Sequence, residues 1–321
     1  MTIWIKRLIL LTALLAAVLV SVCAAEDERE EGAFPELNED GFLDSGEYVF
    51  EDEENGVWRY ASDKLRIEIY RMEQKQPARV WYEAEIFCAP GSGGPRMVAC
   101  NAEDWMKSKD YPYKIARRTG TVLAISNDYA QLRLQKKNNR PGIIIRDGTV
   151  YGSRTRPKNS GGFPNLDCLA IWPDGDMKVF YSDEKTADEY LADGAVDVLA
   201  FGPILIRDGE LNEAALKKYG TSRAERVAVG MVEKGHYYFM MLEGRIKRSK
   251  GDAIRFLAER LLEKGCTLGF NLDGGQTASI VFMGHQLCRI KDGNRNVSSR
   301  MTSDILGIGH SDLLPLEADP W

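Results

Sequence analysis

The stretch 271–279, Asn-Leu-Asp-Gly-Gly-Gln-Thr-Ala-Ser, places amides, a carboxylate, two glycines and two hydroxyls close together. A carboxylate can activate water or stabilise a positive charge, and amides and hydroxyls hydrogen-bond polar ligands. Apolar residues precede the stretch at Leu268 and Phe270 and follow it at 280–282, which predicts a turn between two buried strands. Two interpretations stay open, a functional site and an ordinary hairpin, because Asp-Gly is also typical of tight turns.

Side-chain spacing within this stretch favours a shared pocket. Residues two apart in a strand lie on the same face. Strand alternation therefore predicts that Asn271 and Asp273 share a face, and that Thr277 and Ser279 do likewise. A structural alternative for Asp273 is an Asx hydrogen bond that caps its own turn.

The same stretch resembles the Asn-Leu-Asp-Gly-Gly-Gly-Ser signature of the phosphodiester glycosidase family, with Gln276 in the place of the third glycine. Further segments resemble the family's motifs in the family's order along the chain: Ala124-Ile-Ser-Asn-Asp-Tyr129, Arg140-Pro-Gly142 with Asp147-Gly148, Arg226-Val-Ala-Val-Gly230, Glu243-Gly-Arg245 and Arg300-Met-Thr-Ser-Asp-Ile-Leu-Gly-Ile308. The resemblance extends over residues 80–310. Two departures, Gln276 and the missing Gly-Gly-Phe-Phe after Asn127, could alter the pocket and the substrate preference.

The resemblance implies hydrolysis of the glycosidic bond of a sugar-1-phosphodiester. Such a reaction needs a stabilised anomeric centre, a positioned water and a neutralised leaving phosphate. Asp273 is the candidate carboxylate, and Arg226 and Arg300 are the candidate phosphate clamp, because a guanidinium can donate two parallel hydrogen bonds to phosphate. The candidate substrate-binding residues are Asn127, Asn271, Gly274, Gly275, Thr277 and Ser279.

Alternatives remain for several of these roles. Each arginine could instead form a structural salt bridge. Glu243 could serve as a second acid or base, but Glu243-Gly244 is also a turn sequence, and the turn is favoured. The glycines at 274 and 275 are expected to let a sugar approach the backbone closely.

The two ends of the chain predict its domain organisation. Lys6-Arg7, the apolar run 8–22 and the small residues Cys23 to Ala25 are typical of a secretory signal, with a membrane anchor as the alternative. Residues 26–54 contain fourteen acidic residues and a single base, which predicts a solvated acidic spacer. The phosphodiester glycosidase-like domain is then expected over residues 55–312, and a C-terminal tail over 313–321.

Charge and metal-ligand content limit the partners. The whole chain carries −6, the segment before residue 26 carries +2 and the spacer carries −13, so residues 55–321 carry +5. A mildly basic domain suits an anionic glycan. The sequence contains no stripe of basic residues interleaved with aromatic residues, so it does not indicate a nucleic-acid partner.

The sequence contains three histidines and no Cys-x-x-Cys motif, which argues against a zinc site. A divalent cation could assist the arginines, although no spacing demands one. Cys88 and Cys100 flank a turn-rich loop and could pair.

The periodicity predicts an α+β fold, a single catalytic domain whose mixed β-sheet is flanked by helices. Strands are expected at 65–69, 80–88, 121–125 and 142–145, and helices at 102–109, 113–118, 183–193 and 254–262. The resulting hypothesis is a secreted or extracytoplasmic hydrolase, free or membrane-anchored, that acts on envelope or extracellular glycans. The alternatives are a non-catalytic protein that binds anionic polysaccharide and a glycosyl-phosphate transferase in exopolysaccharide biosynthesis.

Overall fold

The computed structural model describes residues 32–136, 139–155, 164–292, 295–297 and 299–314. It divides into two units, residues 1–35 and 36–321, and the fold described here is that of the second unit. The predicted signal or anchor at 1–25 and the end of the predicted tail, 315–321, lie outside the described residues. Within the described ranges, no helix is long and apolar enough to cross a membrane.

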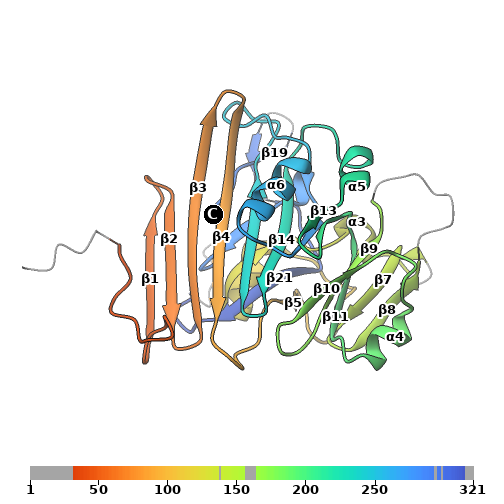
Figure 1. Cartoon of the computed structure of the whole chain (residues 1–321), viewed down its shortest axis with the longest axis horizontal. Coiled ribbons are helices and arrows are strands. Elements are labelled where there is room, and N and C mark those ends of the chain that lie inside the picture. The colour runs from red at the N-terminus through yellow and green to blue at the C-terminus, as the bar shows by residue number, and fades with distance from the viewer. Residues whose placement is uncertain (1–31, 137–138, 156–163, 293–294, 298, 315–321) are drawn as a thin grey trace, which may run out of the picture. The chain divides into compact units, whose positions relative to one another are not determined.

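One large β-sheet is the main structural element of this unit (Figure 1). Its nine strands lie in the order β1 (Glu47–Asp52), β2 (Val57–Ser62), β3 (Leu65–Lys75), β4 (Ala78–Cys88), β15 (His236–Leu242), β14 (Arg226–Glu233), β16 (Leu268–Leu272), β12 (Ile204–Arg207) and β13 (Glu210–Leu211). Strand β1 comes from the acidic segment 26–54 and pairs along its whole length with β2. The acidic segment therefore contributes the edge strand of this sheet.

Two five-stranded sheets accompany the large one. The first has the order β10 (Met177–Phe180), β9 (Asp167–Ile171), β11 (Asp197–Phe201), β7 (Gly142–Arg146) and β8 (Thr149–Arg154). The second has the order β18 (His285–Gln286), β17 (Ile280–Phe282), β6 (Thr121–Ile125), β21 (Asp304–His310) and β5 (Arg96–Ala99). A separate two-stranded ribbon joins β19 (Ile290–Asp292) to β20 (Arg295–Val297).

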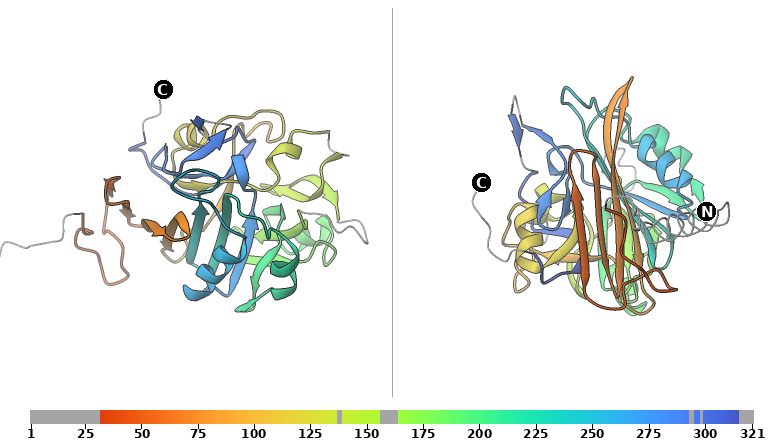
Figure 2. Two further views of the ribbon diagram at one scale, coloured as in Figure 1. Left: turned by 90° about the horizontal axis from the view of Figure 1, so that it is seen from above. Right: turned by 90° about the vertical axis from the view of Figure 1, so that its left-hand side faces the viewer.

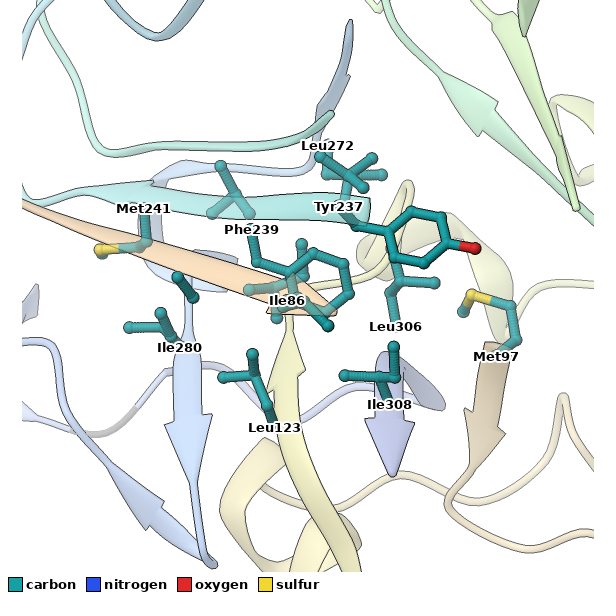
Figure 3. Packing of buried hydrophobic residues seen from close by; sticks show 14 of the residues in the cluster. Ile86, Met97, Leu123, Tyr237, Phe239, Met241, Leu272, Ile280, Leu306 and Ile308 are labelled. Carbon is teal, nitrogen blue, oxygen red and sulfur yellow. The ribbon is translucent and has the colours of Figure 1, made fainter. Parts of the chain in front are cut away.

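The main hydrophobic core lies where the three sheets meet. Apolar side chains of the large sheet, such as Ile86 and Phe239, pack against Leu123, Ile280 and Leu306 of the second five-stranded sheet (Figure 3). All five side chains are fully buried. Burial of apolar surface is the dominant favourable contribution to packing between sheets.

Short helical segments lie between the strands in the described part of the chain. They are α2 (Pro112–Thr119), α3 (Ala130–Arg133), α4 (Ala187–Ala192), α5 (Glu213–Lys218), α6 (Arg255–Glu263) and the 3₁₀ turn η2 (Gly275–Thr277). Helix α6 packs Leu257 and Leu261 on the large sheet, whereas α2 packs Ile115 on the second five-stranded sheet. Figure 2 shows α6, in blue, and α2, in yellow, on opposite sides of the large sheet.

The expected strands and three of the four expected helices are confirmed, but the sheet type is not. The predicted helix 102–109 is a series of turns. The fold is dominated by strands, and every strand pairing described is antiparallel, so the predicted mixed sheet is wrong. The reason is that α6 carries the chain from β15 to β16 across β14, which pairs with both.

The cysteines form no disulfide among the described residues. Cys88, Cys100, Cys168, Cys266 and Cys288 all carry free thiols. The possible pairing of Cys88 with Cys100 is therefore not formed, and the Sγ of Cys100 instead accepts a hydrogen bond from Arg118 at 3.4 Å. The remaining cysteine, Cys23, lies outside the described residues.

Candidate active site

The polar stretch 271–279 joins two sheets rather than two strands of a hairpin. Strand β16 pairs with β14 and β12 in the large sheet, whereas β17 pairs with β6 and β18 in the second five-stranded sheet. The hairpin interpretation is therefore wrong. Residues 275–277 form the 3₁₀ turn η2, so strand alternation does not govern Thr277, contrary to the prediction.

Asp273 is fixed by the segment that follows β6. Its backbone N–H donates to the carbonyl of Asn127 at 3.1 Å, and its carbonyl accepts from the hydroxyl of Ser126 at 2.7 Å. The backbone N–H of Ala130 donates to the Oδ2 atom of Asp273 at 3.2 Å. Thr277 adds a side-chain hydrogen bond to the same carboxyl. Asp273 therefore has one defined orientation, as a catalytic group requires.

The surroundings of Asp273 give it an unusual proton affinity. Burial raises the pKa of its carboxyl, and the negative charge of Asp128 raises it further. Hydrogen bonds from Thr277 and Ala130 and the positive charge of Arg300 lower it, and the net pKa is about 7. Near neutral pH the carboxyl is thus present in both forms, which is the condition for efficient general acid or base catalysis.

The two glycines shape the turn against the start of β14. A Cβ on Gly274 would lie 2.5 Å from the carbonyl oxygen of Glu225. The N–H of Gly275 donates to that oxygen at 3.2 Å, and Gly275 has a φ of +59°. Gly274 therefore has no room for a side chain against this backbone, and the positive φ of Gly275 is a conformation that glycine adopts at low cost. At Gly274 the space without a Cβ is therefore filled by protein backbone, not by an approaching sugar as predicted.

Arg300 lies at the same turn. Its backbone N–H donates to the carbonyl of Gln276 at 2.7 Å, and its Nη2 donates to Gln276 Oε1 at 2.8 Å. Its charge acts on Asp273 and lowers the pKa of that carboxyl. The structure therefore brings Arg300, from the segment 300–308, together with Asp273 and Gln276 of the stretch 271–279.

Arg226 lies close to the turn but its guanidinium is directed into the protein. It is 7% exposed and donates to three backbone carbonyls, those of Asp252 at 3.3 Å, Gly220 at 3.2 Å and Ser222 at 2.6 Å. Burial and the charge of Arg245 lower the pKa of Arg226 to about 10. These contacts differ from the predicted phosphate clamp and also from the salt-bridge alternative.

The exposed guanidinium beside the turn belongs to Arg245, which was not predicted as a site residue. Its side chain is 53% exposed, and its Nη2 lies 3.1 Å from the position of a Cβ on Gly275. Its Nε donates at 2.7 Å to Oε2 of Glu225, a carboxylate that is 1% exposed. The segment Glu243-Gly-Arg245 resembles a family motif, and that resemblance was the signal that could have identified Arg245.

Two asparagines and a serine line the same region with unused acceptors. The Nδ2 of Asn271 donates to the carbonyl of Gly202 at 2.9 Å, and the Nδ2 of Asn127 donates to Asp304. All three side chains are buried, and among the described residues no group donates to Asn127 Oδ1, Asn271 Oδ1 or Ser279 Oγ. Buried acceptors of this kind normally bind a water molecule or a ligand donor.

Residues 119–308 identify the family of this chain. The phosphodiester glycosidase family model matches residues 119–308. The chain belongs to the phosphodiester glycosidase family. The match contains Asp273, Arg300, Arg245 and both asparagines, so the whole constellation lies in the part of the chain that is typical of the family.

Two relatives are only distantly similar to this chain. The chain is 28% identical over 173 residues to the SPbeta prophage-derived uncharacterized protein YomE of Bacillus subtilis, which is 53% of this chain and 26% of that protein. It is 27% identical over 150 residues to human N-acetylglucosamine-1-phosphodiester alpha-N-acetylglucosaminidase, which is 43% of this chain and 29% of that protein. The matches thus span less than a third of the length of these relatives.

A solved member of the phosphodiester glycosidase family has the same fold. The catalytic domain of zebrafish N-acetylglucosamine-1-phosphodiester alpha-N-acetylglucosaminidase, auto-inhibited by its pro-peptide, superposes with a TM-score of 0.59 at 18% identity. The superposition covers 83% of this chain and 88% of that chain. At this identity the likeness is one of fold alone.

Glu243 and a metal site are the two remaining candidates. Glu243 is fully buried and accepts hydrogen bonds from Arg248, the N–H of Arg289 and Tyr82, so it holds the loop before Arg245 in the core. Among the described residues, no group of three or more His, Cys, Asp or Glu side chains could hold a metal ion.

A stability measurement can test the placement of Arg226. We expect Arg226→Met to lower the free energy of unfolding by about 2–4 kcal/mol, because three buried carbonyls lose a charged donor. The matched control is Arg118→Met, which removes an exposed ion pair to Asp110. This variant should change the free energy of unfolding by less than about 1 kcal/mol. Urea unfolding of both variants measures the difference. Equal midpoints would contradict the structural role.

Proposed function

We propose that this member of the phosphodiester glycosidase family hydrolyses the bond between the anomeric carbon and the bridging oxygen of a sugar-1-phosphodiester. The observation that carries the proposal is Asp273, a fixed carboxyl with a pKa of about 7, with Arg300 and Arg245 beside the same turn. Family membership supports the reaction class, and the site geometry supports the assignment of residues.

The proposed reaction proceeds by attack of water on the anomeric carbon. The bond from that carbon to the phosphate oxygen breaks, and its electrons remain on the departing phosphomonoester. The Asp273 carboxylate accepts the proton that water loses, which its near-neutral pKa makes effective. Arg245 and Arg300 offset the charge on the departing phosphate, which is already a good leaving group because its second pKa is about 6.

The substrate is proposed from the site and from the human relative. The name of that relative specifies an α-linked N-acetylglucosamine-1-phosphodiester, so this is the first sugar to test. The buried acceptors Asn127 Oδ1 and Asn271 Oδ1 suit sugar hydroxyls or an N–H group. We further propose that residues 1–25 direct export, that the enzyme acts outside the cytoplasm, and that its substrates are envelope or extracellular glycans.

An isotope experiment tests the bond that is cleaved. The purified protein is incubated in H₂¹⁸O with a panel of alkyl α- and β-sugar-1-phosphodiesters, and the products are identified by mass spectrometry. We expect a free sugar that carries ¹⁸O and an unlabelled phosphomonoester. Label in the phosphate would instead show P–O cleavage and would refute the proposed reaction.

Binding without turnover is the second candidate function. Gln276, which stands in the place of a family glycine, accepts a hydrogen bond from Arg300. This contact engages one of the two proposed phosphate partners. Calorimetric binding of a sugar-1-phosphodiester with no product after prolonged incubation would favour this function over hydrolysis.

A further inference from the structure

A cluster of charged side chains lies fully buried behind the candidate active site. Arg146 of β7 donates to Asp304 of β21 at 2.7 Å and to Asp128 at 3.1 Å. Arg133 donates to the same Asp128 oxygen at 2.5 Å, and Asn127 Nδ2 donates to Asp304. All five side chains are 0% exposed. Two positive and two negative charges balance, so the cluster is neutral as a whole.

This buried network is anchored to rigid strands on both sides. The N–H of Ala200 in β11 donates to Asp128 Oδ2 at 2.9 Å, and Arg146 donates to the carbonyl of Val198 at 2.7 Å. Arg133 donates to the carbonyl of Ala200 at 2.8 Å. The network therefore connects the segment after β6 to both five-stranded sheets.

The segment that the network holds is the one that contacts Asp273. Three hydrogen bonds join residues 126–130 to Asp273. Ser126 Oγ donates to the carbonyl of Asp273, and the N–H of Ala130 donates to its carboxylate. The N–H of Asp273 donates to the carbonyl of Asn127. Asn127 and Asp128 are members of both the network and the segment. A shift of either side chain would therefore displace the donors around the carboxyl.

The free-energy cost of burying charged groups indicates that the network does more than stabilise the fold. Removing four charges from water is costly, and well-packed apolar residues of similar volume often stabilise a core as well or better. A buried ionic network instead imposes one geometry, because each charge tolerates few alternative positions. We propose that the network of Asn127, Asp128, Arg146 and Asp304, with Arg133, is a positioning device that holds segment 126–130 in place around the catalytic carboxyl. The proposal rests on the function proposed above for Asp273.

The electrostatics support this arrangement. The charge of Asp128 raises the pKa of Asp273, and the charge of Arg300 lowers it. Arg245 and its partner Glu225 are the other charged groups beside the turn. Replacing Asp128 by a neutral side chain removes a nearby negative charge and leaves two arginines less compensated. Both changes favour the ionised form of Asp273, so the pKa of its carboxyl should fall.

The test combines a titration with kinetics. The ¹³C carboxyl signal of Asp273, assigned by its loss in Asp273→Asn, is followed against pH in the wild-type protein and in Asp128→Asn. We expect the midpoint to move to lower pH and kcat for the phosphodiester to fall by about tenfold or more with little change in KM, because the carboxyl loses its position. The titration is independent of turnover, so it remains informative if no hydrolysis is found.

The matched control is Glu83→Gln in β4. Glu83 is 4% exposed and pairs with Arg260 at 2.7 Å and Lys264 at 3.1 Å, under α6 and without contact to segment 126–130. This variant should leave both the Asp273 midpoint and kcat unchanged. If Asp128→Asn does not fold, Asp304→Asn, which keeps the side-chain shape, takes its place. Wild-type midpoint and kcat in a folded network variant, or failure of both variants to fold, would overturn the proposal.

Discussion

Asp273→Asn should lower kcat for a sugar-1-phosphodiester by about a thousandfold, because positioned acid–base groups contribute roughly 10²–10⁴-fold to rates. Asparagine keeps the shape of the side chain and can accept the hydrogen bond from Ala130, so the site should stay folded. Initial rates of sugar release measure the effect. Residual activity above a tenth of the wild-type rate would remove Asp273 from the mechanism.

The pH dependence of the two proteins provides a control for this substitution. Wild-type kcat/KM should rise as the pH increases through about 7, the pKa of the Asp273 carboxyl, because the carboxylate is the form that accepts the proton of water. The Asp273→Asn variant should lack this step. Matching pH profiles would show that another group controls the reaction.

The same pKa predicts how stability changes with pH. A carboxyl has an unfolded pKa of about 3.9, and in the folded protein the value rises to about 7. The folded state binds the proton more tightly, so the stability from protonated Asp273 is complete below about pH 4 and is lost as the pH rises through 7. Wild-type protein should therefore lose stability relative to Asp273→Asn between these pH values, as measured by urea unfolding.

Removal of the exposed guanidinium is expected to have the second largest effect. The double variant Arg245→Met/Glu225→Gln should lower kcat/KM by about a hundredfold, because a preorganised charge at the leaving phosphate contributes several kcal/mol to catalysis. Glu225 is changed as well because a buried carboxylate without its arginine would destabilise the fold by about 3–5 kcal/mol. Steady-state kinetics on the best substrate of the panel give the comparison.

Glu225→Gln alone is the matched control for the double variant. It keeps Arg245 beside Gly275 and should retain activity within about tenfold of the wild-type protein, because the cation remains. If the single and double variants lose activity equally, the effect arises from the buried glutamate position, and Arg245 has no separate role at the phosphate.

Local patterns predicted much of the secondary structure. The apolar spacing of Ile254, Leu257 and Leu261 indicated α6, and the strands expected at 65–69 and 80–88 correspond to β3 and β4. These features were predictable because each depends on residues close together in the chain, where side-chain period and backbone geometry are directly linked. The predicted helix 102–109 shows the limit of the approach, since this segment forms turns.

The candidate site was predicted only in part. The motif order placed Asp273 and Arg300 in one functional group, and the structure brings them together at the turn. The motif order did not distinguish the roles of Arg226 and Arg245. Arg226 donates to backbone carbonyls, whereas the guanidinium of Arg245 is exposed. Both arginines lie in family-like motifs, and the direction of a side chain depends on neighbours that are distant in sequence.

Residue types and their order along the chain predicted the family, the candidate carboxylate and most of the strands, because these are properties of short segments. Tertiary structure decided that residues 272 and 280 belong to different sheets, that the surroundings of Asp273 raise the pKa of its carboxyl to about 7, and that Arg146 and Asp304 form a buried ion pair. The physical reason is that desolvation and ion pairing act through space, between groups as far apart in sequence as Arg146 and Asp304.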